Sequence, residues 1–280
     1  VWGGEDNVPP IYGRVFACIK PERGNILDSD EKVAISKMIA PYSIVTTGIE
    51  FVDPKYIELE INTTIYYDSN ATLRSPDNIK IDVVNQIEAY RQEQLQKFNG
   101  VFRFSKFTSM IDRIDPSIQS NITRIRLFVP AEPVFGSNEF YEFDLVNPIF
   151  TSGQPTESLI STGFYIAEND TVVHYIDDDG QGNLRLFHYK SIEGSNTNKY
   201  IVDDSIGTVD YRRGLIRINR INIIGLASND FYFIIKPLSN DVISVRNYIV
   251  DIPQTRVSVN MISSTATQSM IDYQFTSSRT

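Results

Sequence analysis

The chain has 280 residues, of which 41% are hydrophobic, and its formal net charge at pH 7 is −9. This length is enough for one large domain or two ordinary ones with packed cores. The negative charge argues against nucleic-acid binding, which demands a concentrated basic surface. We interpret each of the basic pairs, Arg124 with Arg126 and Arg212-Arg213, as a solvated strand face or a turn and not as a phosphate site. No apolar run approaches the roughly 20 residues of a membrane span, so no membrane partner is expected.

Strands and helices alternate along the first 130 residues. A strand runs from Val15 to Lys20, and a helix follows Asp28, whose spacing to Glu31 is that of a capping box. From Ile57 to Tyr67 apolar and polar side chains alternate, which predicts a strand with one buried face. The longest helix is predicted from Asp77 to Asn99, with Gly100 as its C-cap.

A short strand, a second helix through Ile111 and a strand from Ile122 to Val129 follow. This order predicts an α+β fold class, in which residues 1–130 form an α/β sandwich unit with helices on a mixed sheet. Residues 131–262 lose the helical periodicity and are predicted to form a β-rich domain, with a hairpin around Arg213-Gly214. Residues 263–280 are rich in Ser and Thr and are predicted to form a tail that orders on a partner.

The acidic cluster Asp177, Asp178 and Asp179 is the best candidate for a cation site. The pattern fails the EF-hand test, because Leu186 would stand where a bidentate Glu is needed. We therefore favour a hairpin turn whose acids stay solvated. His174 and His188 lie symmetrically about this turn, so they are expected opposite each other on paired strands.

Such a histidine pair could hold a metal or sense pH, and the alternative that we favour is two half-exposed strand residues. We predict no cofactor and no metal. No elbow for a catalytic Ser is present, and Cys18 lies in an apolar strand, where it reads as a small buried side chain suited to a reducing cytoplasm. The chain is therefore not expected to be an enzyme or to take a small-molecule substrate.

Several short motifs, in order, resemble a known family. They are Gly3-Gly4, Pro9-Pro10-x-Tyr12-Gly13-x-Val15, Val52-Asp53-Pro54-x-Tyr56, the long helix ending at Gly100, and Gly207-Thr208-Val209-Asp210-Tyr211-x-x-Gly214-x-Ile216. In this order they resemble the C-terminal region of the baseplate wedge proteins of T4-like contractile-tailed phages, within the baseplate J-like family. The resemblance implies a fragment of a structural virion protein in the tail baseplate, assembled in the host cytoplasm.

The resemblance further implies a homodimer that joins neighbouring wedges into a ring around the central hub, and that contacts other baseplate wedge proteins. This ring would hold the baseplate together through its change of shape before sheath contraction. The alternative function is a carbohydrate- or receptor-binding module of a phage tail, with Tyr and Asp side chains of the β-rich half facing a glycan. For the assembly function, our candidate contact surfaces are the exposed side of the helix from Asp77 to Asn99 and the hairpin from Asp178 to Gly182.

Overall fold

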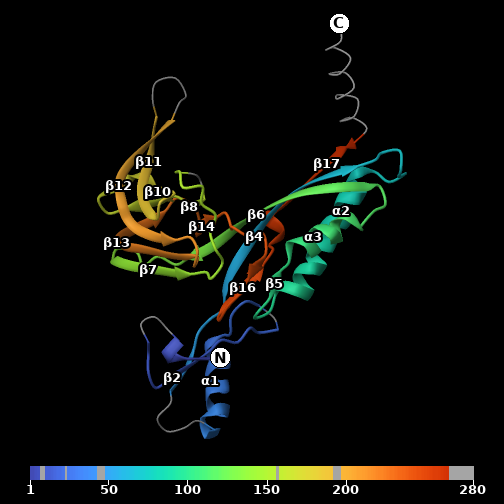
Figure 1. The fold of residues 1–280 in the computed structure, drawn as a ribbon. Coiled ribbons are helices and arrows are strands. Elements are labelled where there is room, and N and C mark those ends of the chain that lie inside the picture. The colour runs from blue at the N-terminus through green and yellow to red at the C-terminus, as the bar shows by residue number, and fades with distance from the viewer. Residues whose placement is uncertain (7–9, 23, 43–47, 156–157, 192–196, 265–280) are drawn as a thin grey trace.

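A computed structural model describes residues 1–6, 10–22, 24–42, 48–155, 158–191 and 197–264 (Figure 1). Of the residues described, 47% are in strands and 20% in helices. The predicted α+β fold class, with an α/β sandwich unit at the N-terminal end, is therefore wrong, and the protein is mainly β. The predicted tail beyond residue 264 lies outside the described residues.

One twelve-stranded sheet connects most of the molecule. Its strands are β4 (Lys55–Tyr67), β6 (Ile118–Ala131), β7 (Asn138–Asp144), β8 (Leu159–Ser161), β9 (Phe164–Ile166), β10 (Asn169–Asp178), β11 (Asn183–Ser191), β12 (Thr197–Asp210), β13 (Leu215–Leu226), β14 (Phe231–Ile235), β16 (Tyr248–Asp251) and β17 (Val257–Ser263). Strands β9 to β13 pair in a closed circuit, because β10 bonds both β9 and β11. This circuit forms the strand-rich side of the molecule in Figure 1.

Strand β4 is the centre of the other half of the sheet. It pairs with β6 in antiparallel fashion along one edge. Along its other edge it pairs in parallel with β16 and then with β17, which lie one after the other. The predicted alternation is confirmed, because Ile57, Leu59, Ile61 and Ile65 are all buried on one face.

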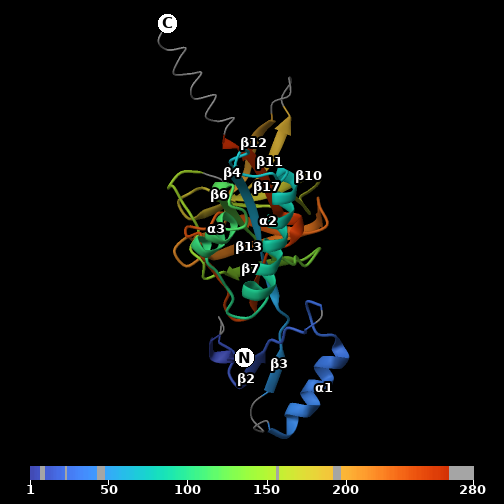
Figure 2. The ribbon, with the colours of Figure 1, turned by 90° about the vertical axis from the view of Figure 1, so that its right-hand side faces the viewer.

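Two helices cover the buried face of β4 and β6: α2 (Pro76–Tyr90) and α3 (Phe104–Asp112) (Figures 1 and 2). Ser75 caps α2 by accepting the amide hydrogen of Asn78 at 3.3 Å. The predicted end of this helix is wrong, because α2 gives way after Tyr90 to a π-helical turn over Arg91–Leu95.

The left-handed residue that ends this segment is Asn99, with φ of 56°, and not Gly100. Gly100 is required for a different reason. A Cβ atom there would lie 2.7 Å from the carbonyl oxygen of Leu95, so the chain can pass only without a side chain.

A smaller unit precedes β4. It contains β1 (Trp2–Gly3), β2 (Arg14–Ala17) and β3 (Gly48–Phe51) in one sheet, the 3-10 turns Gly4–Asp6 and Ala40–Tyr42, and α1 (Ser29–Ile39). The predicted capping box is confirmed, since Glu31 N donates to Asp28 Oδ1 at 2.8 Å and Asp28 N donates to Glu31 Oε2 at 3.0 Å. Figure 2 shows α1 standing beside β3, apart from the main sheet.

This placement explains the wrong fold class. The alternating order of strands and helices was assigned to one layered unit, but α1 buries no side chain and does not cover the main sheet. Among the described helices, α2 and α3 do so, at the end formed by β4, β6 and β17. Two further short strands, β5 (Val101–Phe102) and β15 (Val242–Ile243), pair with each other, and a 3-10 turn, Gln254–Arg256, precedes β17.

Two other expectations are confirmed in the described residues. The hairpin of β12 and β13 aligns Val209 with Ile216. Arg124 and Arg126 are exposed on β6, and Arg212-Arg213 lies in the turn before β13. Among the described helices, none combines the length and the apolar character needed to cross a membrane.

The central place of β4 gives a prediction for stability. Replacing the fully buried Ile61 by Ala should lower the free energy of unfolding by about 2–5 kcal/mol, because apolar contacts are lost and a cavity is left. The matched control is Ile81→Ala on the exposed side of α2, which should change it by no more than about 0.5 kcal/mol. Denaturant unfolding measures both, and equal losses would contradict the position assigned to β4.

Candidate functional site

The three aspartates of the hairpin between β10 and β11 have different environments. Asp179 lies in the turn, where its carboxylate accepts the amide hydrogens of Gln181 at 2.7 Å and Asn183 at 3.0 Å. Partial burial raises the pKa of Asp179, but the hydrogen bond from the side-chain amide of Asn183, together with these backbone bonds, outweighs it, so that the net pKa is lowered. Gly180 has φ of 78°, and a Cβ atom there would lie 2.2 Å from the carbonyl oxygen of Gln154. This turn is thus a packed part of the fold.

The prediction that these acids stay solvated is wrong for Asp177 and Asp178. Asp177 accepts hydrogen bonds from Arg185, at 2.7 and 3.1 Å, and pairs with Lys199. Asp178 is 0% exposed and accepts from Tyr211 Oη at 2.7 Å and Leu159 N at 3.1 Å. Burial raises the pKa of Asp178. Both carboxylates bind partners within the same chain, so they connect neighbouring segments of the fold.

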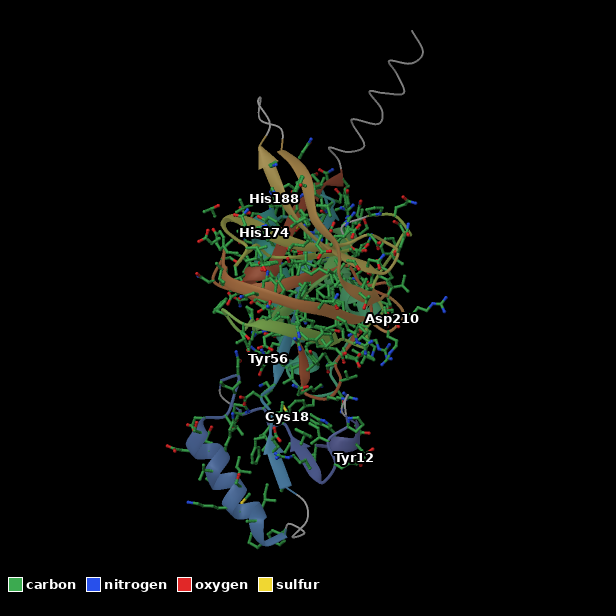
Figure 3. All side chains as sticks on the ribbon, turned by 90° about the vertical axis from the view of Figure 1, so that its left-hand side faces the viewer. Tyr12, Cys18, Tyr56, His174, His188 and Asp210 are labelled. Carbon is green, nitrogen blue, oxygen red and sulfur yellow. The ribbon has the colours of Figure 1, made fainter. Side chains whose placement is uncertain are left out.

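The prediction that the two histidines face each other is confirmed. His174 on β10 lies opposite His188 on β11, and the ring centroids are 5.6 Å apart (Figure 3). The expectation that they are half-exposed is wrong, because their exposed fractions are 1% and 8%. Burial lowers the pKa of His174, and His188 lowers it further. Within the described residues, no group of three His, Cys, Asp or Glu side chains could hold a metal ion.

Cys18 follows β2 and is buried, as the sequence indicates. Burial, followed by the charge of Asp53, raises the pKa of its thiol to about 11. Since the thiolate is the reactive form, the buried thiol is a poor nucleophile.

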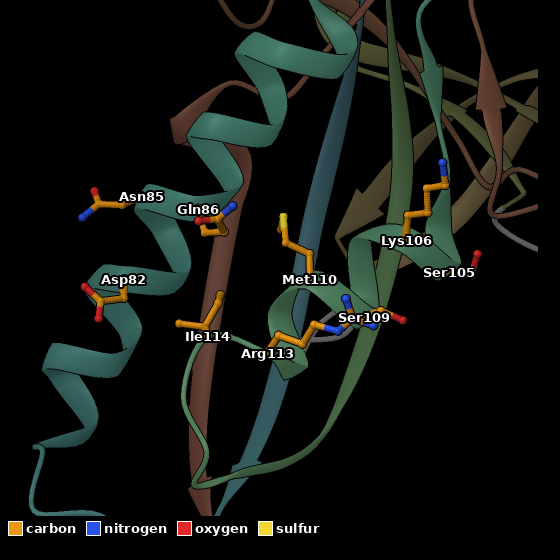
Figure 4. Close-up of a pocket in the computed structure, with 9 residues that line it drawn as sticks. All are labelled: Asp82, Asn85, Gln86, Ser105, Lys106, Ser109, Met110, Arg113 and Ile114. Atoms are coloured by element: carbon orange, nitrogen blue, oxygen red, sulfur yellow. The ribbon is translucent and has the colours of Figure 1, made fainter.

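The exposed side of α2 borders a groove shared with α3 (Figure 4). The groove has a volume of about 910 Å³ and is lined mainly by polar side chains. Its lining residues are Asp82, Asn85, Gln86, Ser105, Lys106, Ser109, Met110, Arg113 and Ile114. Asp82 is already paired with Arg74. The groove lies on one of the two surfaces chosen from the sequence, and its polar lining suits contact with a hydrated protein surface.

A third surface, in the N-terminal unit, was missed. Seven large apolar side chains between residues 11 and 49 are exposed: Ile11, Tyr12, Ile26, Val33, Met38, Tyr42 and Ile49. Figure 3 shows Tyr12 on the side of this unit away from α1. A signal was present in the sequence, since Val33 falls on the side of a helix away from Ile35 and Ile39, and Met38 falls between these two sides. The two on α1, Val33 and Met38, are the candidates for contact with another protein.

Two protein families match this chain. The family described as "Baseplate structural protein gp6, C-terminal domain I" matches residues 1–50, and the family described as "Baseplate structural protein gp6, C-terminal domain III" matches residues 55–129. The baseplate wedge protein gp6 of Enterobacteria phage T4 is 23% identical over 122 residues, which are 44% of this chain and 18% of that protein. Residues 1–50 and 55–129 therefore match C-terminal domains of a phage baseplate wedge protein.

The two matched regions coincide with separate parts of the structure. The domain I match covers the N-terminal unit, and the domain III match covers β4, α2, α3 and most of β6. The protein is a structural component of the virion tail baseplate. The exposed surfaces described above are therefore candidate contacts with other proteins.

The buried histidine pair of this wedge protein predicts a pH dependence of stability. The pKa of His174 in the folded state lies below its ordinary value of 6.5, so the unfolded state takes up protons first as pH falls through 6.5. The stability that the folded state gains while His174 is neutral is fully present above pH 6.5 and is lost as the pH falls below that value. Denaturant unfolding at a series of pH values should show a steeper loss for the wild-type chain than for His174→Gln. Equal slopes would contradict this reading.

Proposed function

We propose that this chain dimerises and links neighbouring wedges into a ring around the central hub of the baseplate. In this role it holds the baseplate together through the change of shape that precedes sheath contraction, and it contacts other baseplate wedge proteins. The observation that carries the proposal is the successive match of two gp6 C-terminal domains within residues 1–129. The proposed role is structural and not catalytic.

A ring imposes a geometric requirement on each chain. A closed assembly built from dimers needs one contact within the dimer and a second contact between dimers. The structure offers two separate surfaces that suit this requirement: the exposed apolar side chains of the N-terminal unit and the polar groove between α2 and α3. They lie on different parts of the molecule, as Figure 2 shows, so both could be occupied at once.

We further propose that the chain consists of three parts. Residues 1–130 would form the baseplate J-like part, residues 131–262 a β-rich part and residues 263–280 a partner-binding tail. The pairing of β16 and β17 with β4 brings the end of the second part back to the first, so the β-rich part would be an insertion within one sheet.

The proposal predicts self-association of the purified chain. One chain has a mass of 31.9 kDa, so light scattering behind size exclusion should give at least twice that value as concentration rises. Hydrophobic contact between exposed apolar side chains provides the driving force. A mass of one chain at every concentration would contradict the dimer.

A further inference from the structure

Helix α1 lacks the packing that normally stabilises so short a helix. It has eleven residues, and none of its side chains is buried. Its inner side, with Ile35 and Ile39, is only half-buried, and Lys32 ties it to Asp53 with an ion pair at 2.7 Å. Helices shorter than about 12–15 residues are marginal in water without tertiary packing. An additional surface against α1 would therefore stabilise it.

The outer side of α1 carries a regular stripe. Asp30, Val33, Ala34, Lys37 and Met38 follow the spacing i, i+3, i+4, i+7 and i+8, which places them on one side of the helix. All five are exposed, with exposed fractions of 51% for Val33 and 68% for Met38. Asp30 and Lys37 form no ion pair with any part of the chain that the structure describes. The stripe thus presents apolar side chains for contact, together with one negative and one positive side chain that have no ion-pair partner among the described residues.

The order of the charges is self-complementary in one arrangement. The acidic side chain lies in the first turn of α1 and the basic one in the last turn. If a second α1 runs antiparallel about a two-fold axis near Ala34, each Asp30 faces the Lys37 of the other copy. The small side chain of Ala34 lets the helix axes approach to the 8–10 Å or so that is usual for packed helices. The opposed helix dipoles also favour this direction.

We propose that α1 docks against α1 of a second copy of this chain, antiparallel, with Ala34 at the crossing point. This inference rests on the proposed dimer and assigns its contact surface. It requires the apolar parts of both stripes, Val33 and Met38, to be buried between the helices, while the two symmetry-related pairs of Asp30 and Lys37 set the direction.

Charge reversal tests the antiparallel pairing. In Asp30→Lys or Lys37→Asp alone, both pairs become like-charged, so the dissociation constant of the dimer should rise about tenfold. In an equimolar mixture of the two variants, every pair of a mixed dimer is again opposite in sign, and association should recover. The control is Asp77→Lys, which removes a first-turn acid from α2 and should leave the dimer unchanged. Light scattering over a dilution series measures all four samples.

The results test the proposed dimer and the proposed α1 contact separately. If the wild-type chain stays monomeric, the proposed dimer fails and the contact fails with it. If the wild-type chain dimerises and neither single reversal weakens it, or if the mixture does not recover, the α1 contact alone is overturned.

A cross-link gives a second readout that does not depend on charge. Ala34→Cys places a thiol at the proposed crossing point, while the native Cys18 is buried. Mild oxidation should produce a covalent dimer that a reducing agent converts back to single chains, and Asn229→Cys in the exposed bend between β13 and β14 should not. No covalent dimer from Ala34→Cys under conditions where the wild-type chain is dimeric would overturn the contact.

Discussion

The burial of one face of β4 is the constraint on which the rest of the structure depends. A strand in the middle of a sheet must have partners on both edges, because buried backbone groups need hydrogen bonds. Strand β6 supplies them on one side, and β16 and β17 supply them on the other from nearly 200 residues further along the chain, as in the pairing of Val257 with Ile61. The apolar face that results is closed by α2 and α3. One strand thus joins the beginning and the end of the described fold.

Ion pairs reinforce this closure at the point where the C-terminal strands return. Arg91, in the π-helical turn after α2, donates to both carboxylate oxygens of Asp251 on β16, at 2.6 and 3.0 Å. Arg256 pairs with Glu58 on β4 and lies over the ring of Phe128, 3.6 Å from its centroid. These contacts are partly buried, where a geometrically matched guanidinium and carboxylate hold their arrangement better than exposed pairs do. The central sheet and its helices therefore form a firm body.

The N-terminal unit is packed less completely than the central sheet and its helices. It is joined to this body by few polar contacts, among them Tyr56 Oη to Asn25 O at 3.0 Å and Arg246 to Asp6 O at 2.8 Å. Its helix buries no side chain, and seven of its large apolar side chains are exposed. A subunit whose core is firm and whose outlying unit is incompletely covered is suited to assembly with neighbours, because partners complete the packing that the single chain lacks.

Local structure could be predicted from the sequence, but the packing of segments that are far apart in the chain could not. The alternation of β4, the capping box of Asp28 with Glu31 and the register of His174 with His188 depend on neighbours along the chain or across one turn. The burial of Asp177 and Asp178 depends on Lys199 on β12 and Tyr211 in the turn after β12, and no local pattern in the sequence indicates these partners. The fold class failed for the same reason. Whether α1 covers a sheet is decided by tertiary packing, to which its own pattern of apolar residues is a weak guide.

Amide hydrogen exchange across a dilution series tests the central claim most directly, since it reports on the firm core and the uncovered helix in one experiment. The account predicts that the amides of β4 are strongly protected at every concentration, while those of α1 exchange rapidly in the dilute chain and slow as the chain associates. Protection of α1 that does not change with concentration would contradict the claim that a second copy completes this unit.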